Sequence, residues 1–320
     1  GFSMFIILRF NFAKSSNYAV AELRFIERRV HNLSTDRAVD AAAKGSQSPL
    51  AVSATNFSAF YPTVGGEQIH ALADFTLDVE DGEFVVIIGP SGCGKSTFLR
   101  TVADLHDTNN AAGKLTVCGG PPRSARLSRQ IGFMFQQPAL LPWRTVIENV
   151  NIPLEVAQID KPRITPREML KLVGLAGFEK ALPRECSGGM RQRVAMARSL
   201  MLQPSVLLLD EPFAAVDEFN RDRLNLALQD IWAATNPAVL YVTHSVMEAV
   251  FLADRIVVMS VRPGRVRGII EIPFERPRSL DLRTTVEFFH LMNKARGLFQ
   301  QEPDIPHDTG VQQESRAKSG

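Results

Sequence analysis

Residues 89–97 read GPSGCGKST and combine glycines, one lysine and three hydroxyl side chains in a short stretch. Glycines permit a tight loop whose N–H groups turn inward, and a helix starting there adds its positive end, so the main chain can hold a polyphosphate. Lys95 would reach the β- and γ-phosphates of ATP, Ser96 would ligate Mg²⁺ and Thr97 would contact the α-phosphate. The stretch predicts an ATP site formed by Gly89, Pro90, Ser91, Gly92, Cys93, Gly94, Lys95, Ser96 and Thr97.

The flanks of this stretch are those that a phosphate loop requires. An apolar run at residues 84–88 precedes it, and residues 98–105 after it are compatible with a helix. The alternative is a glycine-rich turn without a ligand. The flanks and the complete Lys95–Ser96 pair favour the phosphate loop.

Two carboxylates follow a second apolar run, at residues 206–209. Asp210 suits indirect Mg²⁺ binding through water, and Glu211 suits a general base that deprotonates an attacking water. Ligands of open parallel sheets lie at the carboxyl ends of the strands, where both residues would be placed. Taken alone, Asp-Glu-Pro is also common in a surface turn.

Two further apolar runs, at residues 131–135 and 238–242, end at Gln136 and at Thr243 followed by His244. A glutamine can touch both the metal and the water, and a histidine can contact the γ-phosphate. Each residue alone is more often structural, but together the strand ends predict one pocket. The predicted catalytic residues are Lys95, Gln136, Glu211 and His244, and the predicted Mg²⁺ ligands are Ser96, Gln136 and Asp210.

The elements that would position these residues follow from the hydrophobic pattern. From 51 to 275, short apolar runs alternate with helical segments, which predicts a parallel sheet flanked by helices. Strand patterns disappear at about 138–186, where 146–157 and 166–173 have helical spacing, so we expect an inserted helical subdomain.

The two ends of the chain differ from this body. Residues 1–50 predict a poorly structured extension with a short helical stripe around 23–33, to which we assign no function. Residues 276–320 predict a helix whose apolar face includes Val286, Phe289 and Leu291, followed by a polar, disordered tail from 300.

Composition limits the function classes. The 320 residues carry a net charge of +2, so no broad nucleic-acid-binding face is expected. The three cysteines, Cys93, Cys118 and Cys186, lack metal-ligand spacing and favour a reducing compartment. The apolar runs are far shorter than the roughly 20 residues that cross a bilayer, and no secretory leader is recognisable. A cytoplasmic protein is the default expectation.

A second candidate anion site lies at residues 186–193, which read CSGGMRQR before a helical pattern. Ser187 looks like an N-cap, and Ser187, Gly188 and Gly189 at a helix start could bind an anion. A capped helix without a ligand explains the same residues, and the pattern does not decide between the two.

At this segment the sequence resembles the ATP-binding cassette (ABC) ATPases, over roughly residues 52–268. The resemblance implies an α/β P-loop NTPase (RecA-like) core with a mainly parallel sheet, an antiparallel β subdomain and an inserted helical subdomain. It makes Gln136 the Q-loop residue, His244 the switch histidine, and Asp217 part of a D-loop at 215–217. Tyr61 would stack on adenine, although the adjacent Phe60 could do so instead. The family's usual signature has Leu and Gln where this chain has Cys186 and Met190.

The resemblance also implies partners. The signature of one subunit closes over the phosphate loop of another, so we expect a head-to-tail homodimer or a paired ATPase subunit. We also expect a separate membrane permease, a solute-binding protein that acts indirectly, and a peripheral location on the cytoplasmic face of the inner membrane. The stretches at 140–146, 243–249 and 262–265 look like those of nitrate, sulfonate and taurine importers.

Other interpretations are an importer for another substrate, a cassette ATPase of repair or translation, and a scaffold that binds nucleotide without turnover. Repair and translation ATPases would carry a coiled-coil insertion or two fused cassettes, and this sequence shows neither. A scaffold would lack part of the set Lys95, Asp210, Glu211 and His244, and all of these are present.

Overall fold

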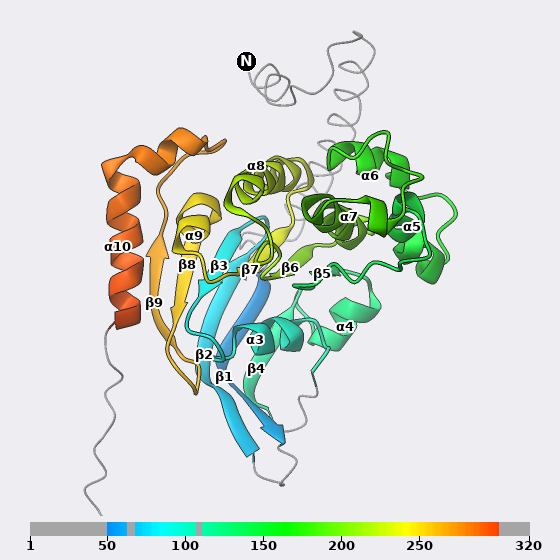
Figure 1. Cartoon of the computed structure of the whole chain (residues 1–320). Coiled ribbons are helices and arrows are strands. Elements are labelled where there is room, and N and C mark those ends of the chain that lie inside the picture. The colour runs from blue at the N-terminus through cyan, green and yellow to red at the C-terminus, as the bar shows by residue number, and fades with distance from the viewer. Residues whose placement is uncertain (1–49, 63–67, 107–110, 301–320) are drawn as a thin grey trace, which may run out of the picture.

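The computed structural model describes residues 50–62, 68–106 and 111–300, coloured in Figure 1. The side chains of Tyr61 and Pro62 are not part of this description. The predictions for the N-terminal extension and the polar tail lie outside the described residues.

A six-stranded sheet forms the centre of the molecule (Figure 1). All pairings are parallel except that of the last strand, which runs antiparallel to its neighbour at one edge. The inner strands are short apolar runs because both of their faces are buried, one against helices and the other against a second sheet and a helix. In spatial order the strands are β5 (Ile131–Met134), β6 (Val206–Asp210), β7 (Ala238–Val242), β3 (Phe84–Ile88), β8 (Arg255–Met259) and β9 (Val266–Glu271).

A second sheet is antiparallel and has the order β2-β1-β4, with β1 (Leu50–Pro62), β2 (Gln68–Glu80) and β4 (Ala112–Val117). Its buried side chains form one cluster with Val85 and Ile87 of β3 and with the helix α3 (Lys95–Val102). Phe75 of β2 and Phe98 of α3 pack with ring centroids 4.4 Å apart. The short helix α4 (Pro122–Leu127) follows β4. The α/β core with a mainly parallel sheet and an antiparallel β part is therefore confirmed.

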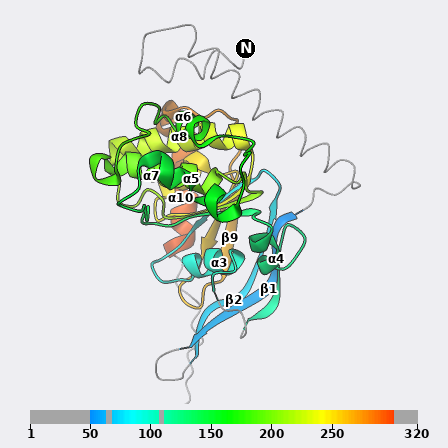
Figure 2. The same cartoon turned by 90° about the vertical axis from the view of Figure 1, so that its right-hand side faces the viewer.

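The helices between β5 and β6 gather on one side of the central sheet (Figures 1 and 2). They are α5 (Val146–Ala157), α6 (Pro166–Leu172), the 3-10 turn η1 (Pro183–Glu185) and α7 (Gly188–Leu200). Thr145 and Thr165 begin α5 and α6 with reciprocal capping boxes, which satisfy free N–H groups of the first turn. Because α7 packs on α5 and α6, this helical group continues past residue 186. The domain boundaries stay a prediction.

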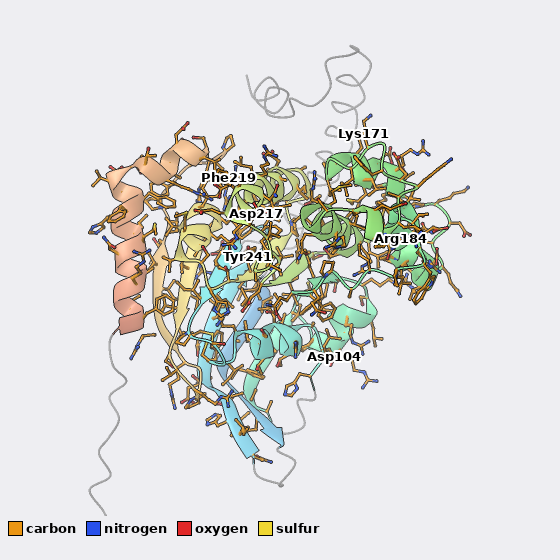
Figure 3. All side chains as sticks on the ribbon, in the orientation of Figure 1. Asp104, Lys171, Arg184, Asp217, Phe219 and Tyr241 are labelled. Carbon is orange, nitrogen blue, oxygen red and sulfur yellow. The ribbon has the colours of Figure 1, made fainter. Side chains whose placement is uncertain are left out.

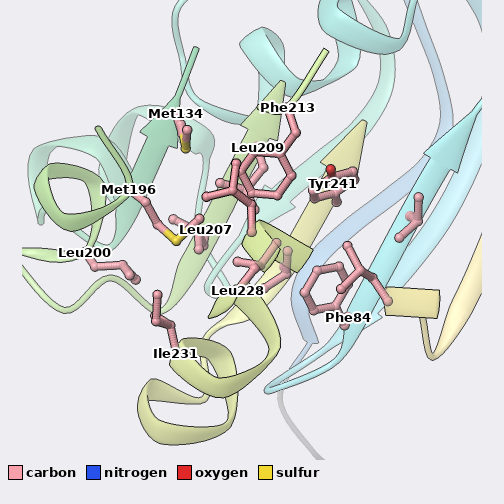
Figure 4. Packing of buried hydrophobic residues seen from close by; sticks show 14 of the residues in the cluster. Phe84, Met134, Met196, Leu200, Leu207, Leu209, Phe213, Leu228, Ile231 and Tyr241 are labelled. Atoms are coloured by element: carbon pink, nitrogen blue, oxygen red, sulfur yellow. The ribbon is translucent and has the colours of Figure 1, made fainter. Parts of the chain in front are cut away.

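Two more helices pack near the last parallel strands, α8 (Glu218–Thr235) and α9 (Val246–Leu252). The core beneath them is shown in Figure 4, where Tyr241 lies between Phe84 and Phe213. The ring centroid of Tyr241 lies 6.1 Å from that of Phe84 and 6.3 Å from that of Phe213. These ring contacts hold the carboxyl end of β7 in place.

The chain then forms η2 (Leu280–Thr284) and α10 (Val286–Gln300), which lies along β9 (Figure 1). The helix occurs where the sequence predicted one, but the predicted face is wrong. Val286 and Phe289 are 84% and 58% exposed, and only Leu291 of that set packs on the core. The buried residues are Phe288, Met292 and Ala295. Among the described residues, no helix combines the length and apolarity that crossing a membrane requires.

Candidate functional site

The strand order brings the predicted strand ends together. β5, β6, β7 and β3 are consecutive neighbours, and because they are parallel their carboxyl ends share one edge of the sheet. Backbone hydrogen bonds continue beyond the strands, from Glu211 N to Val242 O (2.9 Å) and from Thr243 N to Ile87 O (3.3 Å). The predicted convergence of the four strand ends is confirmed.

The lysine of the phosphate loop is buried and hydrogen-bonded to the backbone of the loop. Lys95 is 4% exposed, and its Nζ donates hydrogen bonds of 2.8 Å to the carbonyls of Gly89 and Pro90. Gly92 and Gly94 have φ angles of 74° and 107°, which L side chains rarely adopt. The loop therefore holds a buried cation between the end of β3 and the start of α3. Burial raises the pKa of the neighbouring Cys93 thiol, against the charge of Lys95.

A hydroxyl and a carboxylate meet where Mg²⁺ was predicted to bind. Ser96 Oγ donates a 2.7 Å hydrogen bond to Asp210 Oδ1 at the end of β6. Hydroxyl, carboxylate and amide oxygens are the hard ligands that Mg²⁺ takes, usually with waters and substrate phosphates. The described residues contain no group of three or more His, Cys, Asp or Glu side chains that could hold a metal alone. Ser96 and Asp210 therefore fit an ion that arrives with a nucleotide.

Glu211 lies between Gln136 and His244, two of the other three predicted catalytic side chains. Gln136 Nε2 donates a 3.2 Å hydrogen bond to its Oε2, and His244 Nε2 lies 2.5 Å from its Oε1. Glu211 has a φ of 47°, an uncommon conformation for a residue with a side chain. This backbone conformation after β6 positions the carboxylate between side chains that follow β5 and β7.

The second candidate anion site is a helix start, as predicted. The Ser187 hydroxyl accepts from Met190 N, so Ser187 caps α7, and Gly188 and Gly189 form its first turn. Cys186 is buried among apolar residues, with 5% of its surface exposed, and this burial raises the pKa of its thiol. In Figures 1 and 2, α7 lies apart from α3. Within one chain the structure does not bring these two anion sites together.

Asp217 caps α8 in the same way, at the position labelled in Figure 3. Its carboxylate accepts from the Asn220 side chain and backbone, at 2.8 Å and 3.1 Å, and these bonds lower the pKa of Asp217. The conformation of the 215–217 segment is also held by Arg221, whose Nη2 donates to Val216 O at 2.7 Å.

The two residues predicted to stack on adenine, Phe60 and Tyr61, are adjacent in β1. Tyr61 pairs with Ile69 in the β1–β2 ladder, and its side chain lies outside the described residues. The Phe60 ring stacks on His70 with centroids 4.4 Å apart. One face of Phe60 is therefore covered within the chain.

The loop between β8 and β9 supports the phosphate loop, which the sequence reasoning missed. Arg262 donates from Nε and Nη2 to Gly92 O, at 3.3 Å and 3.1 Å. A Cβ on Gly264 would lie 2.0 Å from Cys93 O, so only glycine permits this approach. The sequence of the 262–265 stretch indicates only a family resemblance and does not reveal this contact.

A second missed contact joins α7 to the segment that carries Gln136. Gln192 Nε2 donates to Gln136 O at 3.4 Å. Arg198 donates to the carbonyls of Pro138 and Ala139, at 2.7 Å and 2.9 Å. The helix that begins at Ser187 therefore fixes the segment that follows β5. The signal in the sequence that could have revealed these contacts is the presence of polar residues on the inward face of α7.

The comparisons with known proteins agree with this geometry. Residues 72–214 match the family model described as ABC transporter. An uncharacterized ABC transporter ATP-binding protein of Methanocaldococcus jannaschii is 44% identical over 239 residues, 74% of this chain and 87% of the relative. The chain belongs to the ABC transporter ATP-binding proteins. An aliphatic sulfonates import ATP-binding protein of Bacillus thuringiensis is 40% identical over 252 residues, 78% of this chain and 96% of the relative.

Solved ABC cassettes have the same fold. A dimeric structure of a bacterial ABC transporter cassette aligns with a TM-score of 0.60 and 30% identity, covering 70% of this chain and all of that one. A structure described as a post-hydrolysis state bound to ADP and Pi aligns with a TM-score of 0.59 and 31% identity. This ABC protein is thus an ATP-binding ATPase with the P-loop NTPase fold. The roles of its individual site residues stay predictions.

We predict that Arg198→Ala loosens the segment after Gln136. The carbonyls of Pro138 and Ala139 would lose their donor. Amide exchange at Leu141, whose N donates to Asn149 Oδ1 at 2.8 Å, should therefore accelerate roughly 10-fold, the effect of about one lost hydrogen bond. Hydrogen exchange followed by mass spectrometry measures this.

The matched control is Arg193→Ala. Arg193 projects from the same helix and also donates to two carbonyls, those of Val173 and Gly174. It should leave exchange at Leu141 unchanged. Equal acceleration in both variants would mean that α7 as a whole, and not Arg198, holds the segment.

Proposed function

We propose that this chain is the ATP-hydrolysing subunit of an importer for a small anion such as nitrate, a sulfonate or taurine. It would pair head-to-tail with a second ATPase subunit and drive a separate permease. The observation that carries the hydrolytic part is the position of Glu211, between Gln136 and His244 and one residue after Asp210. The import part rests on the relative named for aliphatic sulfonates, of which this chain covers 96%.

In the proposed reaction Glu211 accepts a proton from water as the water oxygen attacks the γ-phosphorus. The bond to the β–γ bridging oxygen breaks, and ADP and phosphate leave. Gln136 and His244 orient the carboxylate, and Lys95 binds the β- and γ-phosphates. Mg²⁺ held by Ser96, Asp210 and Gln136 would supply positive charge against the phosphate oxygens. Tyr61 or Phe60 would bind the adenine.

The head-to-tail pairing gives the second anion site a function. A lone ATP on the phosphate loop would leave the helix start at Ser187, Gly188 and Gly189 without a ligand. In a two-fold pair, each Ser187 segment would lie over the partner's ATP, and Asp217 would lie at the interface. The dimeric form of the similar solved cassette supports this arrangement.

The permease would be another polypeptide, and this chain would bind it peripherally at the cytoplasmic face of the inner membrane. A solute-binding protein would deliver the anion and act on this chain only through the permease. The anion would contact the solute-binding protein and the permease, and not this chain. An importer for another substrate or an ABC ATPase outside transport is the alternative.

We predict that Glu211→Gln lowers kcat for ATP hydrolysis by roughly 10²- to 10⁴-fold, the contribution of a general base. ATP binding should be retained, because the phosphate loop is unchanged. Phosphate release and the Kd of a fluorescent ATP analogue measure the two effects. The control is Glu271→Gln, at an exposed residue of the edge strand β9, and this variant should turn over normally. Near-normal turnover in Glu211→Gln would remove Glu211 from its role.

We also predict complementation between two inactive variants. Ser187→Arg blocks the signature, and Lys95→Ala removes the phosphate cation, so each homodimer should be inactive. After mixing, roughly a quarter of wild-type activity should return, since half of randomly formed dimers keep one intact site of two. The presence of heterodimers is verified with two affinity tags. No recovery in verified heterodimers would contradict the sandwiched site.

The cargo is tested with the complete transporter in proteoliposomes. Adding the solute-binding protein with its anion should raise ATP hydrolysis several-fold above the rate without anion, because import couples cargo arrival to the ATPases. Aliphatic sulfonates, taurine and nitrate are compared at equal concentration, with a sugar as the uncharged control. Stimulation by the sugar alone would refute an anion importer.

A further inference from the structure

Glu248 has a buried carboxylate that takes no part in the reaction described above. It lies in α9, whose other residues are apolar, and it is 4% exposed. Burial raises the pKa of Glu248, while Thr243, Arg221 and Tyr241 act against that shift. A buried carboxylate is costly unless its partners use it.

On one side, Glu248 binds the end of β7 and the loop after it. Thr243 Oγ1 and Tyr241 OH donate to its Oε2, at 2.5 Å and 3.2 Å. The same Thr243 hydroxyl accepts from Ser245 N at 3.0 Å, and Ser245 Oγ accepts from Glu248 N at 3.2 Å. These bonds fix the residues on both sides of His244, and therefore the base of the side chain that contacts Glu211.

On the other side, Glu248 faces α8. Its Oε1 lies 3.6 Å from Nε of Arg221. Arg221 donates from Nη2 to Val216 O at 2.7 Å, and its backbone N donates to Asp217 O at 2.8 Å. One carboxylate thus connects the loop of His244 with the 215–217 segment, two parts of the site that come from different elements.

We propose that Glu248 is a positioning residue that holds the His244 loop and the 215–217 segment in one fixed relation. The proposal rests on the proposed roles of Glu211 and His244 in hydrolysis. Arg283 also faces Glu248 electrostatically, but its ion pair is with Asp222, so Arg221 is the cation that links Glu248 to the site. A carboxylate that only filled the core would need no such link.

The test is Glu248→Gln, which keeps the shape of the side chain but removes the charge facing Arg221. Misplaced catalytic groups cost rate more than binding, so kcat should fall roughly 10- to 100-fold. KM and the Kd for ATP should change less than about twofold, because the phosphate loop is untouched. The control is Glu83→Gln, which breaks the Glu83–Arg255 ion pair at the other end of the sheet and should keep kcat.

A double-mutant cycle with Arg221→Gln separates positioning from general stability. If both residues act through one link, the double variant should be no slower than the slower single variant. Additive losses of kcat that follow the melting temperatures would overturn the proposal, as would unchanged kcat in folded Glu248→Gln. Should Glu248→Gln not fold, the kcat of folded Arg221→Gln decides: a 10-fold loss supports the link and none refutes it.

Failure of this inference differs from failure of the proposed function. If Glu211→Gln is inactive and Glu248→Gln is normal, only the positioning role is wrong. If Glu211→Gln turns over normally, the assumed chemistry itself is wrong, whatever the result at Glu248.

Discussion

The parallel pairing of β5, β6, β7 and β3 is the constraint on which the rest of the site depends. Parallel strands place all their carboxyl ends at one edge of the sheet. Residues far apart in sequence therefore meet there because of the strand order, whatever the conformation of the connecting loops. Ser96 and Asp210 are 114 positions apart and still share a hydrogen bond of 2.7 Å. A change in strand order would separate Glu211 from Gln136 or from His244.

The same sheet explains why much of the site could be predicted from the sequence. A strand buried on both faces must be a short apolar run, and a polar residue that ends the run is then visible without any structure. Residues 84–88 and 238–242 were recognised in this way with their observed bounds. The Ser187 cap was visible for a similar reason, since capping needs a particular residue type at one position.

What could not be predicted depends on contacts between distant elements. In α10 the apolar residues include the adjacent pair Phe288 and Phe289, so helical spacing permits two faces, and only packing decides which is buried. Arg262 donates to the carbonyl of Gly92, which lies 170 positions away, and no local sequence pattern predicts that bond. Glu248 did leave a signal, a single acid within an apolar helix, but its partners follow from the three-dimensional arrangement.

The helix α9 shows how the parts beyond the sheet reach the site. Near its N-terminus Glu248 connects it to the His244 loop, and near its C-terminus Arg278 donates to the carbonyls of Phe251 and Ala253, at 3.0 Å and 2.7 Å. Burial lowers the pKa of Arg278 to about 10, so it keeps its charge at neutral pH and suits the negative end of the helix. Because Arg278 also donates to Phe274 O, the segment that follows β9 is bound to the same helix end. A helix of seven residues cannot bend appreciably between these two attachments, so the segment before α10 and the His244 loop share one rigid support.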